Sequence, residues 1–201
     1  MSHRDALLEA ARGLILEKGF AATTARDLVA ASDTNLGSIG YHFGSREALL
    51  NQAIEELFDE WTALLAGAAF SDEDAPPLER LTASWKATLD TLGEHHALIR
   101  AFVEALAHAE RSPDFRKQMR DHYRRSRRTV ARLVEAALGP DAVAKGADPM
   151  MIALFLIAVF DGLALQFRMA PEDTPSGEQL VAALTAARAA ALEQDLGSPR
   201  T

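Results

Sequence analysis

The sequence has 201 residues, and its 21 Lys and Arg against 29 Asp and Glu give a formal net charge of −8. This balance argues against a generally basic nucleic-acid coat and against a polybasic membrane-binding protein. The chain contains no cysteine, which excludes a disulfide scaffold, a Cys-ligated zinc or iron–sulfur site and a thiol nucleophile. With 48% hydrophobic residues, it is long and apolar enough to bury a sizeable core.

Two segments bear on localisation. The first residues, Met1 to Asp5, include no apolar stretch, so no signal peptide is visible. The apolar run from Met150 to Leu165 is shorter than the roughly 18–20 residues of a membrane span, and it contains Asp161. We therefore expect a buried helix there, a cytoplasmic protein and no membrane partner.

Capping and helix-breaking residues divide the chain into helical lengths. Capping-box spacings begin at Ser2 and Thr24. Ser112-Pro113 and Asp148-Pro149 each place an N-cap before a proline at the first helical position. No segment alternates apolar and β-branched residues as strands do. The pattern predicts an all-α fold of about nine helices, over about residues 2–18, 24–32, 35–43, 45–65, 77–93, 95–109, 112–139, 148–169 and 178–196.

Residues 24–43 have the proportions of a DNA-reading helix pair, with two short helices joined by a tight turn. Asp33 lies at the turn, where Asp tolerates a left-handed backbone. Asn35 is the expected N-cap of the second helix, and the free N–H groups at that end suit a phosphate. Ile39 and Phe43 are expected to face the core. The remaining positions lie wholly or partly outward: Leu36, Gly37, Ser38, Tyr41 and His42.

A longer motif surrounds this pair, and it comprises Gly19-Phe20, Thr23-Thr24 and Gly37-Ser38-Ile39-Gly40-Tyr41-His42-Phe43-Gly44-Ser45-Arg46-Glu47-Ala48-Leu49-Leu50. It resembles the DNA-binding domain of TetR-family transcriptional repressors over about residues 5–55. Beyond that range the resemblance lies only in the number and order of helices. This sequence departs from the family at Gly40, where an aromatic residue is usual, and at Asp33, where a turn glycine is usual.

The resemblance implies DNA-binding roles for nine residues of this sequence. Thr24 and Arg26 are expected near the DNA backbone at the start of the support helix. Tyr41 and His42 are expected against phosphates or base edges, and Arg46 is expected to clamp a phosphate. The recognition helix is expected to enter the major groove at its first residues, Asn35, Leu36, Gly37 and Ser38.

Charge is distributed unevenly along the chain. Residues 1–50 contain five basic and six acidic side chains, so the expected DNA-binding head has a net charge near −1. Few neutralised phosphates imply a modest dependence of DNA affinity on salt. Residues 111–132 carry nine basic side chains against Asp114 and Asp121. This basic stripe can be a solvated face, a salt-bridging partner for the acidic remainder, or a nucleic-acid contact.

The helices over about 77–170 carry large apolar side chains that can line a ligand cavity or fill a core. Glu104 and Asp161 stand within apolar runs, where a carboxylate requires a partner such as a ligand cation, Arg100, Arg168 or water. The identity of the ligand cannot be read from these residues. The residues we assign to the cavity are Trp85, Phe102, Glu104, Met119, Phe155 and Val159.

Chemistry other than binding finds little support in the sequence. Glu104 and His108 are four apart, with His95-His96 upstream, but no third metal ligand is predicted. No nucleophile, base and orienting acid can be assembled. We therefore expect no cofactor and no enzymatic activity.

The last two expected helices, 149–169 and 178–196, contain small residues that permit close helix approach, and they are the expected homodimer surface. Our interpretation is a ligand-responsive repressor with a DNA-binding domain over 1–48 and a ligand-binding and dimerisation domain over 49–201. Its expected partners are double-stranded DNA at a pseudo-palindromic operator, a second copy of the chain and a small-molecule inducer. The alternatives are an all-α ligand-binding or enzymatic bundle without a DNA role, and a protein–protein adaptor.

Overall fold

The computed structural model describes residues 2–68, 79, 83, 86, 89, 92 and 95–197. These residues form nine α-helices and one short 3-10 helix and no strand, so the expected all-α fold is confirmed. The elements are α1 (His3–Lys18), α2 (Ala25–Ser32), α3 (Leu36–Phe43), α4 (Arg46–Ala68), α6 (His96–Ala109), α7 (Pro113–Leu138), α8 (Pro140–Ala144), α9 (Pro149–Met169), η1 (Pro171–Asp173) and α10 (Gly177–Gly197).

The first helices begin where their capping residues predict. Ser2 Oγ accepts a hydrogen bond from the Asp5 N–H at 3.2 Å, and the Asp5 carboxylate accepts one from the Ser2 N–H at 3.3 Å. Thr24 and Asp27 form the same reciprocal capping box at α2. Asp33 ends α2 in the left-handed region, at φ 50° and ψ 45°. The chain therefore turns sharply between α2 and α3, as the pair of short helices requires.

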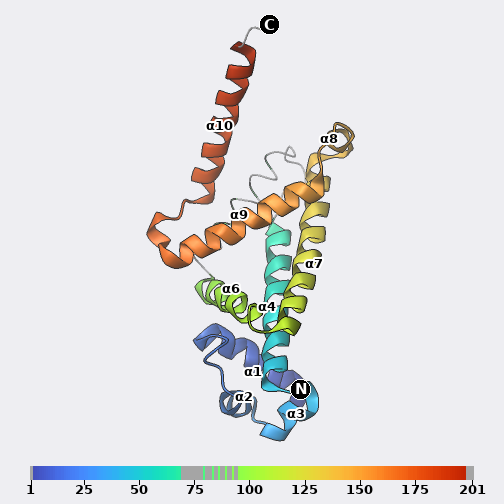
Figure 1. Cartoon of the computed structure of the whole chain (residues 1–201), viewed down its shortest axis with the longest axis vertical. Helices are drawn as coiled ribbons and strands as arrows, with labels where there is room; N and C mark the ends of the chain where they lie inside the picture. The colour runs from blue at the N-terminus through green and yellow to red at the C-terminus, as the bar shows by residue number, and fades with distance from the viewer. Residues whose placement is uncertain are drawn as a thin grey trace.

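Figure 1 shows α1, α2 and α3 gathered around the first turns of α4 at one end of the molecule. Farther along, α4 runs beside α7, and α6 and α9 cross this pair. Beyond its first turns, α10 extends away from the other described helices. The long helix α4 is thus the element shared by the head, which we define as α1 to α3, and the body, which comprises the later helices.

One continuous core joins head and body. Leu7 and Ile15 of α1 and Leu28 of α2 are fully buried, and they belong to the same cluster as Phe102 of α6 and Phe115 of α7. Burial of each large apolar side chain contributes about 1.5–3 kcal/mol relative to its exposure. The head is therefore packed against the body and is not suspended from it on a linker.

Two short elements, α8 and η1, are not predicted by the sequence pattern. Pro140 and Pro171 begin them, because the fixed φ of proline suits a first helical position. Of the predicted helix over 77–93, five positions are described and each is helical; the rest lies outside the described residues. These positions are Glu79, Ala83, Lys86, Leu89 and Leu92.

Candidate nucleic-acid interface and ligand-binding body

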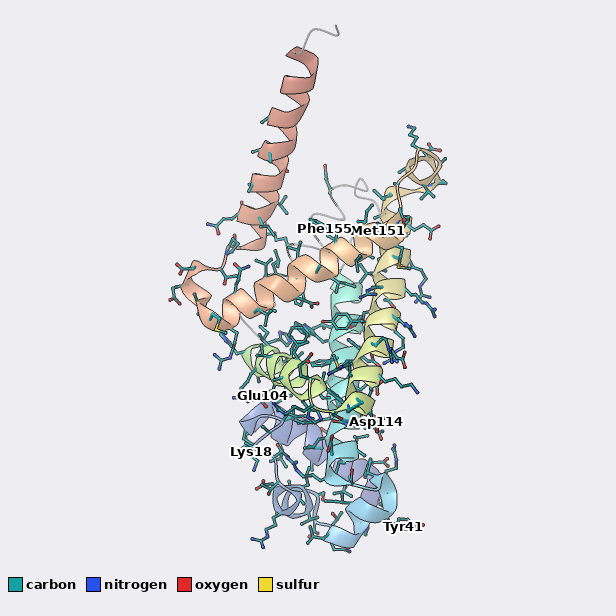
Figure 2. All side chains as sticks on the ribbon, in the orientation of Figure 1. Lys18, Tyr41, Glu104, Asp114, Met151 and Phe155 are labelled. Atoms are coloured by element: carbon teal, nitrogen blue, oxygen red, sulfur yellow. The ribbon has the colours of Figure 1, made fainter. Side chains whose placement is uncertain are left out.

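The second helix of the helix pair, α3, has an outer face that no other described element covers. Leu36 is 57% exposed and Tyr41 is 86% exposed, while Gly37 and Gly40 are exposed between them. Figure 2 shows Tyr41 at the outer end of the head, directed away from the molecule. Leu36, Tyr41 and the two glycines are therefore accessible on the side of α3 that the sequence assigns to DNA.

One polar residue of α3, Ser38, does not have the expected outward orientation. Ser38 is buried, with only 8% of its surface exposed, so the expectation that its side chain points outward is wrong. The Asn35 carboxamide accepts a hydrogen bond from the Ser38 N–H at 3.1 Å, as the N-cap prediction requires. His42 is half-buried, and its ring lies edge-on to Tyr41 at 4.9 Å between centroids. The outer face therefore offers mainly apolar surface.

Arg46 has partners within the protein in addition to any it finds on DNA. Its Nε donates to the Thr23 carbonyl at 2.6 Å, and its Nη2 lies 3.4 Å from the carbonyl oxygens of Phe20 and Ala21. The first turn of α4 thereby holds the loop between α1 and α2. The phosphate clamp stays a prediction, and it now rests on the Nη1 edge of the guanidinium, to which the described residues give no hydrogen bond.

Two of the other four cations in residues 1–50 form ion pairs. Arg12 forms ion pairs with Glu56 and Glu60 of α4, and Lys18 pairs with Asp27. The hydrogen bonds from Lys18 and Thr24 lower the pKa of Asp27 well below its usual range. Arg4 lies 5.3 Å above the centre of the Phe43 ring. Among these described cations, Arg26 is the exposed one for which the structure gives no ion pair.

Two polar side chains of α6 dock the body onto the end of α1. Arg100 Nη2 donates to the carbonyl oxygens of Leu16 and Glu17, at 2.7 and 3.1 Å. Glu104 accepts from the Ala21 N–H at 3.1 Å. Because the two residues are four apart, both reach the head from one face of α6. We call Arg100 and Glu104 the α6 clamp. The sequence placed Glu104 in a ligand cavity, and this assignment is wrong: Glu104 faces the head (Figure 2).

The other residues assigned to the cavity are not brought together either. Phe102 and Met119 are buried in the common core, where Phe102 packs edge-on against Phe58. Val159 is partly buried against that core, whereas Phe155 is 58% exposed on the surface of α9. Trp85 lies outside the described residues. The described chain therefore gives no single cavity lined by the predicted set.

Asp161 accepts a hydrogen bond from a residue that the sequence did not suggest as its partner. The Tyr123 hydroxyl of α7 donates to Asp161 Oδ2 at 2.8 Å. Burial raises the pKa of this carboxyl to about 6, although the hydrogen bond from Tyr123 and the charge of Arg127 oppose the rise. Burial, together with the negative charge of Asp161, also raises the pKa of Tyr123. A titratable group near neutrality thus lies between α7 and α9.

Two buried donors near this pair lack a partner in the described structure. Trp61 Nε1 and Arg127 Nε are buried without a hydrogen bond. Trp61 is only 8% exposed and packs against Phe160, the neighbour of Asp161, at 5.1 Å between ring centroids. The Arg127 guanidinium lies 5.8 Å from the centre of the Tyr123 ring. A buried donor without an acceptor is costly, so these atoms mark a place for a polar ligand or water.

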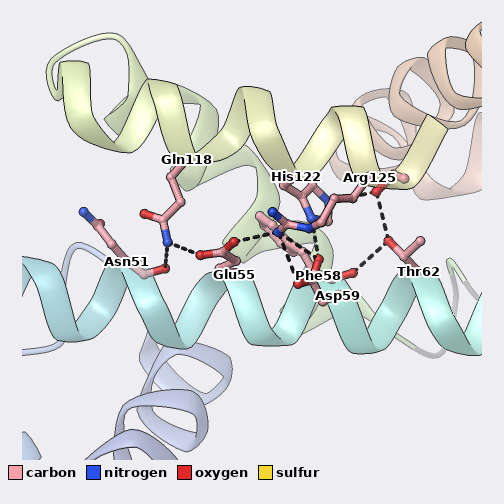
Figure 3. A network of polar contacts seen from close by, with 9 residues as sticks. Asn51, Glu55, Phe58, Asp59, Thr62, Gln118, His122 and Arg125 are labelled. Atoms are coloured by element: carbon pink, nitrogen blue, oxygen red, sulfur yellow. Dashed lines mark hydrogen bonds and ion pairs between the residues drawn. The ribbon is translucent and has the colours of Figure 1, made fainter. Parts of the chain in front are cut away.

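Some cations of the basic stripe over 111–132 form ion pairs within the chain. Figure 3 shows a polar seam between α4 and α7, in which Arg125 bonds to Glu55 and Asp59. His122 Nδ1 lies 2.9 Å from Asp59 Oδ1, and the Gln118 amide donates to Glu55 and to the Asn51 carbonyl. Arg120 and Arg128 remain on the exposed face. The stripe is therefore a mixture of intramolecular ion pairs and solvated cations.

Glu104 and His108 do not converge on a common point. Glu104 bonds to the Ala21 N–H, while His108 Nε2 lies 3.3 Å from Glu47 and its ring packs between Phe20 and Phe115. Among the described residues, no three His, Asp or Glu side chains lie close enough to hold a metal ion.

The helix α9 leaves much apolar surface uncovered. By length and composition it is the one helix of the described chain that could cross a membrane, and only 17% of its most apolar stretch is buried. The expectation of a buried helix over this run is therefore wrong for the single chain. Its uncovered large side chains are Met150, Met151, Leu154, Phe155, Leu165 and Met169. Figure 2 shows Met151 and Phe155 near one end of the helix. A surface of this kind calls for a partner.

Comparison with known proteins agrees with this architecture. A model of the tetR family of bacterial regulatory proteins matches residues 7–53, and a model of the C-terminal domain of BetI-type transcriptional repressors matches residues 77–193. The repressor KstR2 of Mycobacterium tuberculosis is 30% identical over 114 residues, which are 57% of this chain and 56% of KstR2. The repressor DhaR of Mycobacterium sp. strain GP1 is 25% identical over 166 residues, 83% of this chain and 82% of DhaR.

A solved structure shares the fold. The structure of a transcriptional regulator from Saccharomonospora viridis, in complex with choline, has a TM-score of 0.67 and 22% identity, and covers 91% of this chain and 93% of that one. A helix–turn–helix head joined by one continuous helix to an all-α body defines a class of DNA-binding transcriptional regulators. Within that class, the chain belongs to the TetR family. The family and these relatives are regulators and not enzymes, so the enzymatic alternative is set aside.

Proposed function

We propose that the chain is a transcriptional repressor that binds a pseudo-palindromic operator as a homodimer and releases it when a small molecule binds the body. The observation that carries this proposal is α3, a capped helix at the end of the molecule with exposed Leu36 and Tyr41 on its outer face. Its site of action is the cytoplasm, where the DNA lies. KstR2 and DhaR are repressors, which supports repression over activation.

The proposed domains divide at residue 48, with DNA binding before it and ligand binding and dimerisation over 49–201. Because α4 begins at Arg46, this boundary crosses the first turn of α4 and leaves the helix common to both functions. A displacement of the body at α4 therefore reaches the head without an intervening loop.

The proposed DNA contacts follow the geometry of the head. Thr24 and Arg26 at the start of α2 meet the DNA backbone, and the Nη1 edge of Arg46 meets a phosphate. Ser38 is proposed to contribute through its backbone: its N–H donates to Asn35 Oδ1 and so holds the start of α3 in place. The residues in or beside the major groove are Asn35, Leu36, Gly37, Tyr41 and His42.

The dimer surface is proposed on α9 and α10. A second copy related by a two-fold axis covers the apolar side chains of α9 that the described chain leaves exposed, Phe155 included. The same symmetry presents two α3 helices to successive major grooves, about 34–36 Å apart. Dimerisation thus accounts both for the apolar surface and for a pseudo-palindromic operator.

The ligand is proposed to bind in the body near Trp61, Arg127 and Asp161. The Saccharomonospora viridis regulator, which shares the fold, holds choline. In this chain the two unpartnered donors, Trp61 Nε1 and Arg127 Nε, favour a ligand with hydrogen-bond acceptors. Binding that prefers one arrangement of α4 and α6 shifts the heads to a spacing that no longer fits the operator.

The test is a gel mobility shift with DNA from the region upstream of the chain's own gene. Tyr41→Ala is expected to weaken the shift strongly and to leave the fold intact, because Tyr41 is almost wholly exposed. Leu64→Ala is the matched control, since Leu64 is 52% exposed on α4 and lies outside the helix pair. If no DNA gives a sequence-specific shift at low salt, the proposed function is wrong.

A further inference from the structure

The outer face of α3 has a definite order of side chains around the helix. At about 100° per residue, Leu36, Gly40, Gly37 and Tyr41 occupy neighbouring positions over an arc of about 140°. Leu36 and Tyr41 form the two edges, and the two glycines form a strip of bare backbone between them. A Cβ at Gly40 would meet no atom within 4 Å, whereas a Cβ at Gly37 would lie 3.1 Å from Asn35 Oδ1. The strip is therefore open at Gly40 and bordered by the Asn35 carboxamide at Gly37.

The polar groups of α3 are directed elsewhere. The Ser38 side chain is buried, and the Asn35 carboxamide oxygen is committed to the Ser38 N–H. His42 is half-buried beside Tyr41. The arc from Leu36 to Tyr41 therefore presents an isobutyl group, a phenol and backbone, with no charged side chain. The one carboxamide beside it, that of Asn35, lies next to Gly37 and has its oxygen bonded to the Ser38 N–H.

This composition limits what the arc can read in DNA. Guanine is commonly recognised through Arg or Lys and adenine through Asn or Gln, whereas apolar side chains contact the 5-methyl group of thymine. Bare backbone between two bulky side chains leaves room for a methyl group that projects into the major groove.

We propose that α3 reads its half-site chiefly through thymine methyl groups, which are received over the glycine strip between Leu36 and Tyr41. This inference rests on the proposed function, because it requires α3 to lie in the major groove. It assigns Leu36 as a specificity-determining residue and predicts that thymines are required where this arc faces the bases.

The test uses full-length protein and an operator first identified by selection from random duplexes. Each thymine of a half-site is then replaced in turn by deoxyuridine, which removes only the methyl group, and Kd is measured by fluorescence anisotropy. At one or more positions the loss of the methyl group is expected to weaken binding about three- to tenfold. At the same positions, 5-methylcytosine is expected to bind more tightly than cytosine.

A protein variant identifies the contact. Leu36→Ala is expected to remove the difference between thymine and uracil at one position, since the methyl group then loses its partner. Leu64→Ala, the exposed control on α4, is expected to keep the full difference, and thermal denaturation checks that both variants fold.

The outcomes separate the two claims. An operator with every thymine replaced by uracil that binds as tightly as the original overturns the methyl inference and leaves the proposed function standing. Selection that yields no specific DNA overturns the proposed function itself.

Discussion

At the scale of single residues, Gly40 is expected to lower the stability of α3 while it allows the helix backbone to approach DNA. Glycine inside a helix is less favourable than alanine by about 0.5–1 kcal/mol, and a Cβ at Gly40 has free space. Gly40→Ala is therefore expected to raise the free energy of unfolding by about that amount, measured by urea denaturation. It is also expected to weaken operator binding several-fold, because the added methyl group occupies space next to the base edges.

Gly13→Ala is the matched control for this prediction. Gly13 lies inside α1, is exposed, and likewise has no atom within 4 Å of an added Cβ. It should give a similar gain in stability without a change in DNA affinity. Equal DNA affinity for both variants and the unmodified protein would show that the outer face of α3 does not approach DNA.

Asp161 makes a second residue-scale prediction, about pH. Its pKa is raised from 3.8 to about 6 in the folded state, so folding favours the protonated form. The contribution of this carboxyl to the free energy of unfolding is fully present below about pH 4, where it is protonated in both states. That contribution is lost as the pH rises through 6. Asp161→Asn keeps an acceptor for the Tyr123 hydroxyl and avoids that loss. It is expected to raise the free energy of unfolding at pH 7 by about 1–3 kcal/mol and to change it little at pH 4.

Chemical denaturation of both proteins at the two pH values checks this prediction. An equal effect of Asp161→Asn at pH 4 and pH 7 would mean that the ionised carboxylate is fully compensated by its surroundings, Arg127 included.

At the scale of elements, the α6 clamp is the contact through which the body holds the loop after α1. Removal of Glu104 leaves the Ala21 N–H without its acceptor, and a lost hydrogen bond to a charged group costs about 1.5–3 kcal/mol. Glu104→Ala is expected to speed hydrogen exchange in the segment around Ala21 and to weaken operator binding. Glu104→Gln, which keeps an acceptor oxygen, is expected to restore most of the protection.

Glu110→Ala, at the residue that follows α6, provides the control. Glu110 is exposed and pairs with Arg116 of α7, and the structure gives it no hydrogen bond to the loop around Ala21. If Glu104→Ala and Glu110→Ala change exchange around Ala21 equally, the α6 clamp does not position this loop.

At the scale of the whole molecule, the pairing of cations in the head predicts a shallow salt dependence. If only Arg4, Arg26 and Arg46 neutralise phosphates, a dimer neutralises about six, and log K against log salt has a slope of about −5. Participation of all five cations in residues 1–50 would give a slope of about −9. Arg26→Ala should flatten the slope by about 2, whereas Arg128→Ala, on the exposed face of α7, should leave it unchanged. Titrations at four or more salt concentrations measure this.

Dimerisation makes the second prediction at this scale. Phe155→Glu places a charge on the uncovered apolar side of α9 and is expected to shift the protein from dimer to monomer in sedimentation velocity at micromolar concentration. Operator affinity should fall with it, because one head alone makes half the contacts. Lys145→Glu, a charge change at the exposed residue after α8, is expected to leave the dimer intact. A Phe155→Glu protein that remains fully dimeric would place the interface elsewhere.

The sequence predicts best those features that depend on residues close together in the chain. The capping boxes at Ser2 and Thr24, the N-cap at Asn35 and the left-handed Asp33 are local, and the structure confirms each of them. Element order follows for the same reason, since a cap, an apolar stripe and a breaker define a helix without reference to other helices.

Partners across the fold are not predictable in this way. Glu104 and Asp161 were recognised as carboxylates in need of partners, but the Ala21 N–H and the Tyr123 hydroxyl lie 83 and 38 residues away in sequence. From the sequence, Ser38 is expected to point outward, because a helix of eight residues has too few apolar positions to define which side is buried. Phe155 was expected inside because α9 is apolar on every side, so its sequence cannot show which side is covered.

The unbroken course of α4 has a geometric consequence. Its 23 residues make a rod about 34 Å long, with Arg46 holding the head at one end and Glu55 and Asp59 bound to α7 near its middle. A tilt of only about 5° over that length displaces its tip by about 3 Å, close to the rise of about 3.4 Å between base pairs. In the proposed dimer the two tips move in opposite directions, so the distance between them changes by about twice the displacement of one tip. A tilt too small to disturb the core therefore shifts the two heads relative to each other by nearly two base-pair steps.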